Sequence, residues 1–238
     1  DDPGTGPGLC AHGIGTGRVT REAKREAVRA APVYLVTEES LSAGRTTEAI
    51  VDAALEAGVR VVQVREKGGH VRRALAIGEA VRRLTAAAGA LLIVNDRVDL
   101  ALAIGADGVH VGQDDLPLAV VRTMVGPDAV IGLSITASDQ LDADDARACD
   151  YLGVGSIYPT GSKGDAALTG LSLLGQARAS SSLPIVAIGG ISVANAAEVV
   201  AAGADSVAVI SAISGAPDPG GAARQLAEAV ASAIARRI

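Results

Sequence analysis

Aromatic side chains are nearly missing from this sequence, which has no Phe, no Trp and three Tyr among 238 residues. Proteins that bind single-stranded nucleic acid stack its bases on aromatic rings, and this chain has almost none to offer. Its formal net charge of -6 would also repel a phosphate backbone. Nucleic acid is therefore not an expected partner. The hydrophobic fraction of 49% is carried by aliphatic residues, which can fill a large core without rings.

Cysteine and long apolar runs are scarce as well. Cys10 and Cys149 have no repeated spacing, so the sequence predicts neither a disulfide framework nor a zinc site and fits a reducing cytoplasm. No apolar run reaches the roughly 18 residues that a membrane span requires, and the chain begins without the apolar core of a secretory signal. We expect a soluble, cytoplasmic protein with no membrane partner.

The length suits one domain, because a (β/α)₈ (TIM) barrel typically takes roughly 250 residues. Residues 1–17 are glycine-rich and lack apolar periodicity, which predicts a flexible arm. Residues 18–30 are rich in Arg, Glu and Ala and predict a polar helix with little apolar face. We therefore divide the chain into an N-terminal extension, residues 1–30, and a catalytic barrel domain, residues 31–238.

From residue 32 onward, short β-branched runs alternate with Ala-rich helical stretches, which predicts repeated βα units and a parallel sheet. The eight predicted strands are 33–37, 59–65, 91–95, 108–111, 130–134, 151–155, 185–189 and 206–210. Eight helices are expected to begin near Thr46, His70, Arg97, Leu116, Ala137, Leu171, Ser192 and Asp218. An α/β fold of the (β/α)₈ type is the main prediction. An open doubly wound sheet is the weaker alternative, because no Gly-x-Gly-x-x-Gly turn follows the first strand.

Three similar phrases join a helix to the following strand, at residues 56–59, 104–109 and 202–207. Each contains a glycine at the point where the helix should end. A glycine there adopts the left-handed conformation that closes a helix C-terminus, so we interpret the repeats as turn chemistry.

Active sites of such barrels lie at the C-terminal ends of the strands, so polar residues there carry the most functional weight. After the second predicted strand, alternation places Gln63, Arg65 and Lys67 on one face, with Val64 and Glu66 on the other. Two cations and an amide would converge at this point. A solvated strand end is the alternative interpretation.

Carboxylates follow the third and fourth predicted strands. Asp96 comes after Asn95, and Asp114 and Asp115 follow Gln113. Mg²⁺ usually takes one or two carboxylates together with water and phosphate oxygens, so we select Asp96 and Asp115 as its ligands. These aspartates could equally be N-caps of the helices that follow.

Two further segments suit phosphate groups. Residues 158–164 combine hydroxyls, glycines and Lys163, although a surface turn is an equally plausible interpretation. Residues 188–192 and 210–213 follow the last two strands, where barrels commonly hold a phosphate on backbone N–H groups. The sequence thus offers two anion sites, which suits two phosphorylated small molecules.

The three histidines of the sequence do not indicate another type of catalysis. His12, His70 and His110 fall in the arm, at a helix start and in a strand, so no cluster or triad partner is apparent. Hydrolysis by a nucleophilic serine is disfavoured. Lys67 and Lys163 lie among anion-binding residues, so neither stands out as a Schiff-base lysine, and an aldolase is a lesser option.

Taken together, the segments resemble the thiamine-phosphate synthase family over nearly everything from residue 33 to about residue 224. Five motifs carry the resemblance: residues 63–69, 94–96, 110–116, 155–163 and 188–191. The resemblance implies a transferase that joins an aminopyrimidine diphosphate to a thiazole phosphate, carboxylated or not, and releases pyrophosphate.

The resemblance also implies a role for each matching residue. The pyrimidine diphosphate would be held by Gln63, Val64, Arg65, Glu66, Lys67, Asn95, Ser134 and Lys163. The residues implied in catalysis are Arg65, Lys67, Ser134 and Lys163. The thiazole phosphate would be held by Thr160, Gly161, Ser162, Gly190, Ile210 and Ser211. Asp96 and Asp115 would bind Mg²⁺.

Two alternatives remain open. Many relatives have a histidine two residues past the serine that matches Ser134, and a related thiazole tautomerase uses a histidine there for proton transfer. Here that position is Thr136, which argues against the tautomerase. A non-catalytic barrel that binds thiamine precursors and regulates is the other alternative, but the implied metal and diphosphate ligands are all present. A homo-oligomer is possible.

Overall fold

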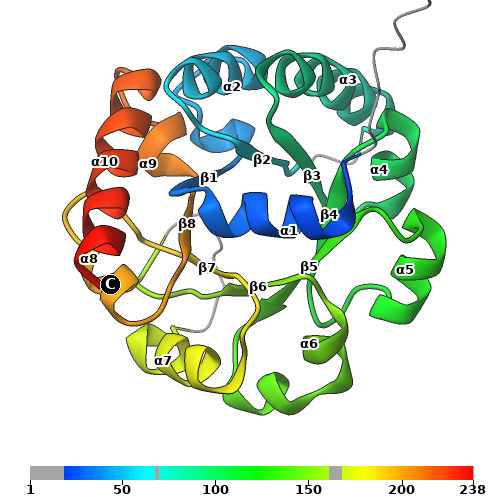
Figure 1. Cartoon of the computed structure of the whole chain (residues 1–238). Helices are drawn as coiled ribbons and strands as arrows, with labels where there is room; N and C mark the ends of the chain where they lie inside the picture. The colour runs from blue at the N-terminus through cyan, green and yellow to red at the C-terminus, as the bar shows by residue number, and fades with distance from the viewer. Residues whose placement is uncertain (1–18, 68–69, 161–167, 238) are drawn as a thin grey trace, which may run out of the picture.

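The computed structural model describes residues 19–67, 70–160 and 168–237, and its parallel strands form a closed barrel in sequence order (Figure 1). The strands are β1 (Val33–Val36), β2 (Val61–Val64), β3 (Leu91–Asn95), β4 (Gly108–Val111), β5 (Val130–Ile135), β6 (Tyr151–Val154), β7 (Ile185–Ile188) and β8 (Ser206–Val209). β8 closes the ring by pairing with β1. The predicted (β/α)₈ architecture is confirmed, and the open sheet is excluded.

Helices surround this barrel, and one more lies across it (Figure 1). They are α1 (Arg21–Ala30), α2 (Thr47–Glu56), α3 (Val71–Ala88), α4 (Val98–Ile104), α5 (Leu118–Val125), α6 (Asp144–Ala148), α7 (Gly170–Ser180), α8 (Ala196–Ala201), α9 (Ser211–Ser214) and α10 (Pro219–Arg237). Short 3₁₀ turns occupy Glu39–Leu41 and Ser138–Asp142. Among the described residues, none of these helices has both the length and the apolar character needed to cross a membrane.

Several helix boundaries differ from the sequence prediction. The helix expected from Ser192 begins at Ala196, because Asn195 Oδ1 accepts the Ser192 N–H at 2.8 Å and holds the intervening residues in a turn. The helix expected from Ala137 is divided into a 3₁₀ turn and α6. The short helix α9, directly after β8, was not predicted. It matters for the site because it turns the chain over the barrel mouth.

Two apolar layers fill the barrel wall and interior. The outer layer lies between strands and helices and contains residues such as Val64, Val109 and Leu133. The inner layer lies inside the ring of strands and includes Tyr34 and Tyr151, which are 1% and 0% exposed. Two of the three tyrosines of the chain therefore lie inside the barrel, where they reappear in the description of the site.

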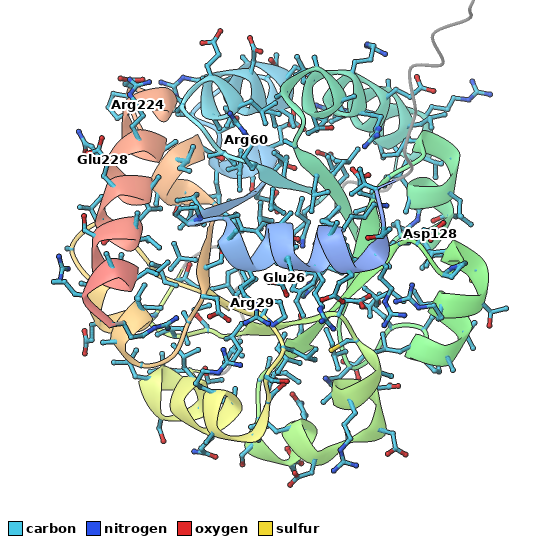
Figure 2. All side chains as sticks on the ribbon, viewed as in Figure 1. Glu26, Arg29, Arg60, Asp128, Arg224 and Glu228 are labelled. Atoms are coloured by element: carbon cyan, nitrogen blue, oxygen red, sulfur yellow. The ribbon has the colours of Figure 1, made fainter. Side chains whose placement is uncertain are left out.

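Helix α1 closes the end of the barrel from which the strands start (Figure 1). Its Val28 is fully buried and belongs to the inner layer, so the helix has one deeply packed residue on an otherwise polar surface. Arg29, labelled in Figure 2, donates to the Ser182 carbonyl at 2.8 Å and to Asp205 at 3.4 Å. The sequence predicted this helix but not its packing, because its apolar face is a single valine.

Three buried or half-buried aspartates hold the strand starts together at this end. Asp150, for example, is fully buried, accepts the Ile131 N–H at 2.8 Å and pairs with Arg122 and Arg21. The same arrangement of a strand N–H, a helix arginine and an α1 cation occurs at Asp107 and Asp205. Two of these aspartates belong to the repeated phrases. The helix-end glycines of those phrases, Gly58, Gly105 and Gly203, have φ of 63° to 120°, as the turn interpretation predicted.

Candidate active site

A cavity of about 580 Å³ opens at the C-terminal ends of the strands. Its walls come from β5, β6, β7 and β8, from the loops that follow them, and from the loops after β2 and β4. The lining residues are Arg65, Lys67, Asp114, Ser134, Thr136, Gly153, Gly155, Ser156, Thr160, Ile188, Gly189, Gly190, Ile191, Ala208, Val209, Ile210, Ser211 and Ala212. A smaller cavity of about 30 Å³ lies against it and shares Arg65 and Ser134. The smaller cavity is lined in part by inner-layer residues such as Tyr34 and Tyr151, so it lies deeper in the barrel than the larger one.

One wall of the cavity carries the cations. Arg65 is only 5% exposed, and its guanidinium forms an ion pair with Glu38 from the loop after β1. Its backbone N–H donates to Thr37 Oγ1 at 3.1 Å. Its Nε is buried and has no hydrogen-bond partner among the described residues. Lys67 is exposed at the rim of the same wall.

Asp96 and Asp115 lie beside one another above β3 and β4. Burial raises the pKa of Asp96, and the neighbouring carboxylate of Asp115 raises it further, while Lys67 opposes the shift. Asp115 also accepts the Gly112 N–H at 2.7 Å, which fixes its carboxylate in the loop. Two hard carboxylates in repulsive contact are the donor set that suits Mg²⁺.

The alternative role of these aspartates as helix caps is not supported. Helix α4 has Arg97 at its N-cap and α5 has Pro117, and neither helix shows a side-chain cap bond in the described part of the chain. No group of three or more metal-ligating side chains was found among the described residues. A cation held by this pair would therefore need water or substrate oxygens to complete its coordination.

The opposite wall is made largely of backbone. Gly189 and Gly190 follow β7 with φ of 104° and 65°, in the left-handed region that favours glycine. A Cβ on Gly189 would lie 2.7 Å from Ser156 Cα, so this loop can pack here only without a side chain. Ile210 and Ser211 lead into α9 at the end of β8. The expected phosphate loops are thus placed side by side at the cavity.

The predicted site residues differ in whether they line a cavity. Gln63 and Asn95 line the smaller cavity, and Thr160 lines the larger one. Val64 points into the outer apolar layer, and Glu66 lines neither cavity. Only the backbone of these two could therefore reach a ligand in the mouth. Gly161, Ser162 and Lys163 lie outside the described residues.

A buried polar cluster inside the barrel escaped the sequence prediction. His110 has partners after all: its Nε2 lies 2.9 Å from Ser134 Oγ and its Nδ1 lies 3.1 Å from the Tyr151 hydroxyl. The expectation that no histidine has a serine partner is therefore wrong. Val109 and Val111 point outward into the helix layer, so the alternation along β4 was the signal that His110 points inward.

Thr136 also lines the cavity, at the position where the thiazole tautomerase would need its histidine. Its backbone N–H donates to Gln140 Oε1 at 2.7 Å, and its Oγ1 accepts from Gln140 Nε2 at 3.2 Å. A threonine hydroxyl engaged in this way is not a proton shuttle at neutral pH.

The fold and the site together define a (β/α)₈-barrel enzyme with its active-site cavity at the C-terminal ends of the strands. The family model described as thiamine monophosphate synthase matches residues 33–213. The chain belongs to the thiamine monophosphate synthase family, and like its relatives it is a transferase.

Individual relatives agree with this assignment. The chain is 51% identical to the thiamine-phosphate synthase of Haloarcula marismortui, over 83% of this chain and 96% of the relative. It is 49% identical to that of Moorella thermoacetica, over 84% and 96%. The solved thiamine phosphate pyrophosphorylase of Pyrococcus furiosus superimposes with a TM-score of 0.80 at 37% identity, over 88% of this chain and 99% of that one.

Proposed function

We propose that this enzyme joins an aminopyrimidine diphosphate to a thiazole phosphate and releases pyrophosphate and thiamine phosphate. The observation that carries the proposal is the pairing of two anion-binding walls in one cavity, cationic at β2 and built of backbone at β7 and β8. Two phosphorylated substrates need two such walls within reach of one another. The thiamine-phosphate synthases named above as relatives support this choice of reaction.

The cationic wall would take the diphosphate. Arg65 is held by Glu38 and lines the cavity, and Lys67 is exposed at its rim, so both can meet phosphate oxygens. Ser134 lies between the two cavities, and Gln63 and Asn95 line the deeper one. In this proposal the pyrimidine ring lies in the larger cavity with one edge against the smaller one, where Gln63 and Asn95 meet it, and the diphosphate stays at the mouth. Lys163 is proposed as a third cation from the family resemblance alone.

The backbone wall would take the thiazole phosphate. Gly190, Ile210 and Ser211 offer N–H groups from the last two loops, the position at which barrels of this type commonly hold a phosphate. Thr160 lines the same cavity, and Gly161 and Ser162 follow it in the sequence. This placement would bring the thiazole ring between the two walls.

Mg²⁺ is proposed as the cofactor, held by Asp96 and Asp115. The fit rests on their hard oxygen donors and on a mutual repulsion that a divalent cation would relieve. When bound, the ion would draw negative charge from the diphosphate and make it a better leaving group.

The reaction requires one bond to break and one to form. The bond between the pyrimidine methylene carbon and the diphosphate oxygen breaks first, and its electron pair leaves with the pyrophosphate. The lone pair of the thiazole nitrogen then forms the new carbon–nitrogen bond. Arg65 and Lys67 would stabilise the charge that develops on the departing group, where fixed cations contribute most. The thiazole nitrogen has no proton to lose, so no general base is required.

An assay tests the proposal directly. Purified protein is mixed with aminopyrimidine diphosphate, thiazole phosphate and Mg²⁺, and pyrophosphate and thiamine phosphate are followed with and without chelator. Equal amounts of both products, formed only with the metal, are expected. Binding of both substrates without turnover would support a regulatory barrel instead, and failure to bind either would contradict the proposed substrates.

A further inference from the structure

A chain of hydrogen bonds crosses the barrel interior beneath the cavity. Gln63 Nε2 donates to the Tyr34 hydroxyl at 2.8 Å, which lies 2.9 Å from the Tyr151 hydroxyl. Tyr151 lies 3.1 Å from His110 Nδ1, and His110 Nε2 lies 2.9 Å from Ser134 Oγ. The five residues come from five strands, β2, β1, β6, β4 and β5. The chain thus joins the deeper cavity to the mouth.

Two strands beside this chain of hydrogen bonds have glycine where a side chain would overlap with it. A Cβ on Gly132 would lie 2.2 Å from Tyr151 Cζ and 2.4 Å from His110 Nδ1. A Cβ on Gly153 would lie 2.6 Å from His110 Cε1. Both glycines belong to strands, where glycine is otherwise unfavourable. The space that the imidazole and phenol occupy therefore exists only because β5 and β6 carry glycine at these positions.

The direction of the chain follows from counting protons. Burial raises the pKa of Tyr34 and of Tyr151 well above that of a free tyrosine, so each phenol keeps the one proton it can donate. When Gln63 donates to Tyr34, the Tyr34 proton is left for Tyr151, the other hydrogen-bond partner of this hydroxyl among the described residues, and the Tyr151 proton then goes to His110 Nδ1. A neutral imidazole then carries its proton on Nε2 and donates it to Ser134 Oγ, which leaves the serine proton for an acceptor at the mouth.

The reverse direction has the opposite result. If the Gln63 amide turned its oxygen toward Tyr34, every hydrogen bond in the chain would run the other way. Ser134 would then donate its proton to His110. The serine would then present only lone pairs to the mouth. Such an oxygen would repel a phosphate group rather than bind it.

We propose that Tyr34, Tyr151 and His110 are positioning residues that pass the orientation of the Gln63 amide to the Ser134 hydroxyl, so that Ser134 donates toward the leaving diphosphate. This inference rests on the proposed function. An aminopyrimidine presents a ring nitrogen acceptor beside an amino donor, and a primary amide matches both with its oxygen and one N–H. The second N–H remains for Tyr34, so a bound ring would keep the direction that the free protein already has.

The first test needs no substrate. The chain has three histidines, so ¹⁵N-labelled histidine gives three sets of ring signals, and a His110→Asn variant identifies those of His110. We expect the ring proton of His110 on Nε2, because Nδ1 accepts from Tyr151, and a loss of that preference in Tyr151→Phe. An imidazole protonated on Nδ1 alone, or on both nitrogens, would overturn the inference whatever the enzyme catalyses.

The second test is a double-mutant cycle measured in kcat. Tyr151→Phe should lower kcat about tenfold when Ser134 is present, since a donor to developing charge is misdirected, and should change it less than about twofold in the Ser134→Ala background. Thr123→Val is the control, because the Thr123 hydroxyl is exposed on α5, donates to the Ala119 carbonyl outside this chain of hydrogen bonds, and its loss should leave kcat unchanged.

The two tests separate the possible failures. A Tyr151→Phe effect of equal size in both backgrounds would mean that the hydroxyl only supports the fold, and the inference would be wrong. A wild-type protein that shows the expected His110 signals but makes no thiamine phosphate would overturn the proposed function, and with it the role of Ser134, while the direction of the hydrogen bonds would stand.

Discussion

Asp96 combines two features that are unusual in one residue. Its backbone has a φ of 58°, a left-handed conformation that is uncommon outside glycine, and the pKa of its carboxyl is raised by burial and by Asp115. Both features are tolerated at sites that bind a ligand, where strain and repulsion are relieved on binding. In a purely structural turn, an asparagine would avoid the repulsion.

An Asp96→Asn variant tests this interpretation. We expect turnover to fall by about a hundredfold or more, because a ligand of the proposed cation is lost. A carboxyl with a raised pKa binds its proton more tightly in the folded state, so its ionisation opposes folding as the pH rises. Without metal, the variant should therefore unfold at an equal or higher urea concentration than the wild type at pH 8.

Asp99→Asn is the matched control for Asp96→Asn. Asp99 is exposed on α4, and its carboxyl pairs with Arg97 on the outside of the barrel, so its loss should not change turnover. Full activity of Asp96→Asn would contradict the proposed metal site, whatever its stability.

Cys149 gives a second prediction at this scale. Burial, and then the nearby Asp150 carboxylate, raises the pKa of its thiol to about 12. The folded state thus favours the neutral thiol, so the free energy of unfolding should decrease as the pH rises above about 8.5, the pKa of a free thiol. In a Cys10→Ser background, a thiol reagent at pH 8 should react slowly with native protein and rapidly in denaturant. Fast reaction of the native protein would contradict this burial.

At the scale of elements, the β7 loop shows how glycine shapes the mouth. Gly189 combines a φ of 104° with a close approach to the backbone of Ser156 on the neighbouring strand end. The first requirement excludes side chains by torsional strain and the second by overlap. Neither can be relieved by a change of rotamer, because the atom approached belongs to the main chain.

Replacing Gly189 by alanine should therefore cost about 2–4 kcal/mol in the free energy of unfolding, from torsional strain and overpacking together. Gly175→Ala serves as control: this glycine lies in α7, and its Cβ would meet nothing closer than the Ala202 carbonyl at 4.0 Å. That change should stabilise the protein by about 0.5–1 kcal/mol. Urea titrations of both variants measure the difference, and a neutral Gly189→Ala would show that the loop can rearrange.

The whole molecule is organised as two ends with different tasks. At the closed end, aspartates, helix arginines and α1 hold the strand starts together with ion pairs and one buried valine. At the open end, Arg65, Lys67, Asp114 and the backbone of the loops after β7 and β8 line a cavity. Stability and binding are thus separated along the barrel axis, as is usual in this fold.

Ligand binding should consequently be visible as a gain in stability of the entire barrel. Mg²⁺ and pyrophosphate together, at about a hundred times the dissociation constant, should raise the free energy of unfolding by about 2.7 kcal/mol. Arg65→Gln should reduce the gain by weakening the diphosphate wall. Thermal unfolding with metal, pyrophosphate, both, or both plus chelator measures it. An equal gain with pyrophosphate alone would contradict the proposed role of Mg²⁺.

Much of this arrangement was predictable from the sequence, because it depends on local patterns. Strands buried on both faces appear as short β-branched runs, and helix ends appear at glycines such as Gly105, so the order of eight βα units could be counted. Since parallel strands all point one way, their polar C-terminal residues had to gather at one mouth. Arg65 and Lys67 were found in this way, and the family motifs added the expected role of each residue.

Only the tertiary structure decided which side chains meet inside the barrel. Tyr34 and Tyr151 are 117 residues apart in the chain, yet their hydroxyls lie 2.9 Å apart. The packing of α1 and the partners of His110 were equally out of reach, because one buried valine gives no periodic signal and the alternation that points His110 inward does not say what it meets there. Local patterns determine which face of a strand points inward. Closure of the barrel determines what each inward residue finds there, because it joins strands that are distant in sequence.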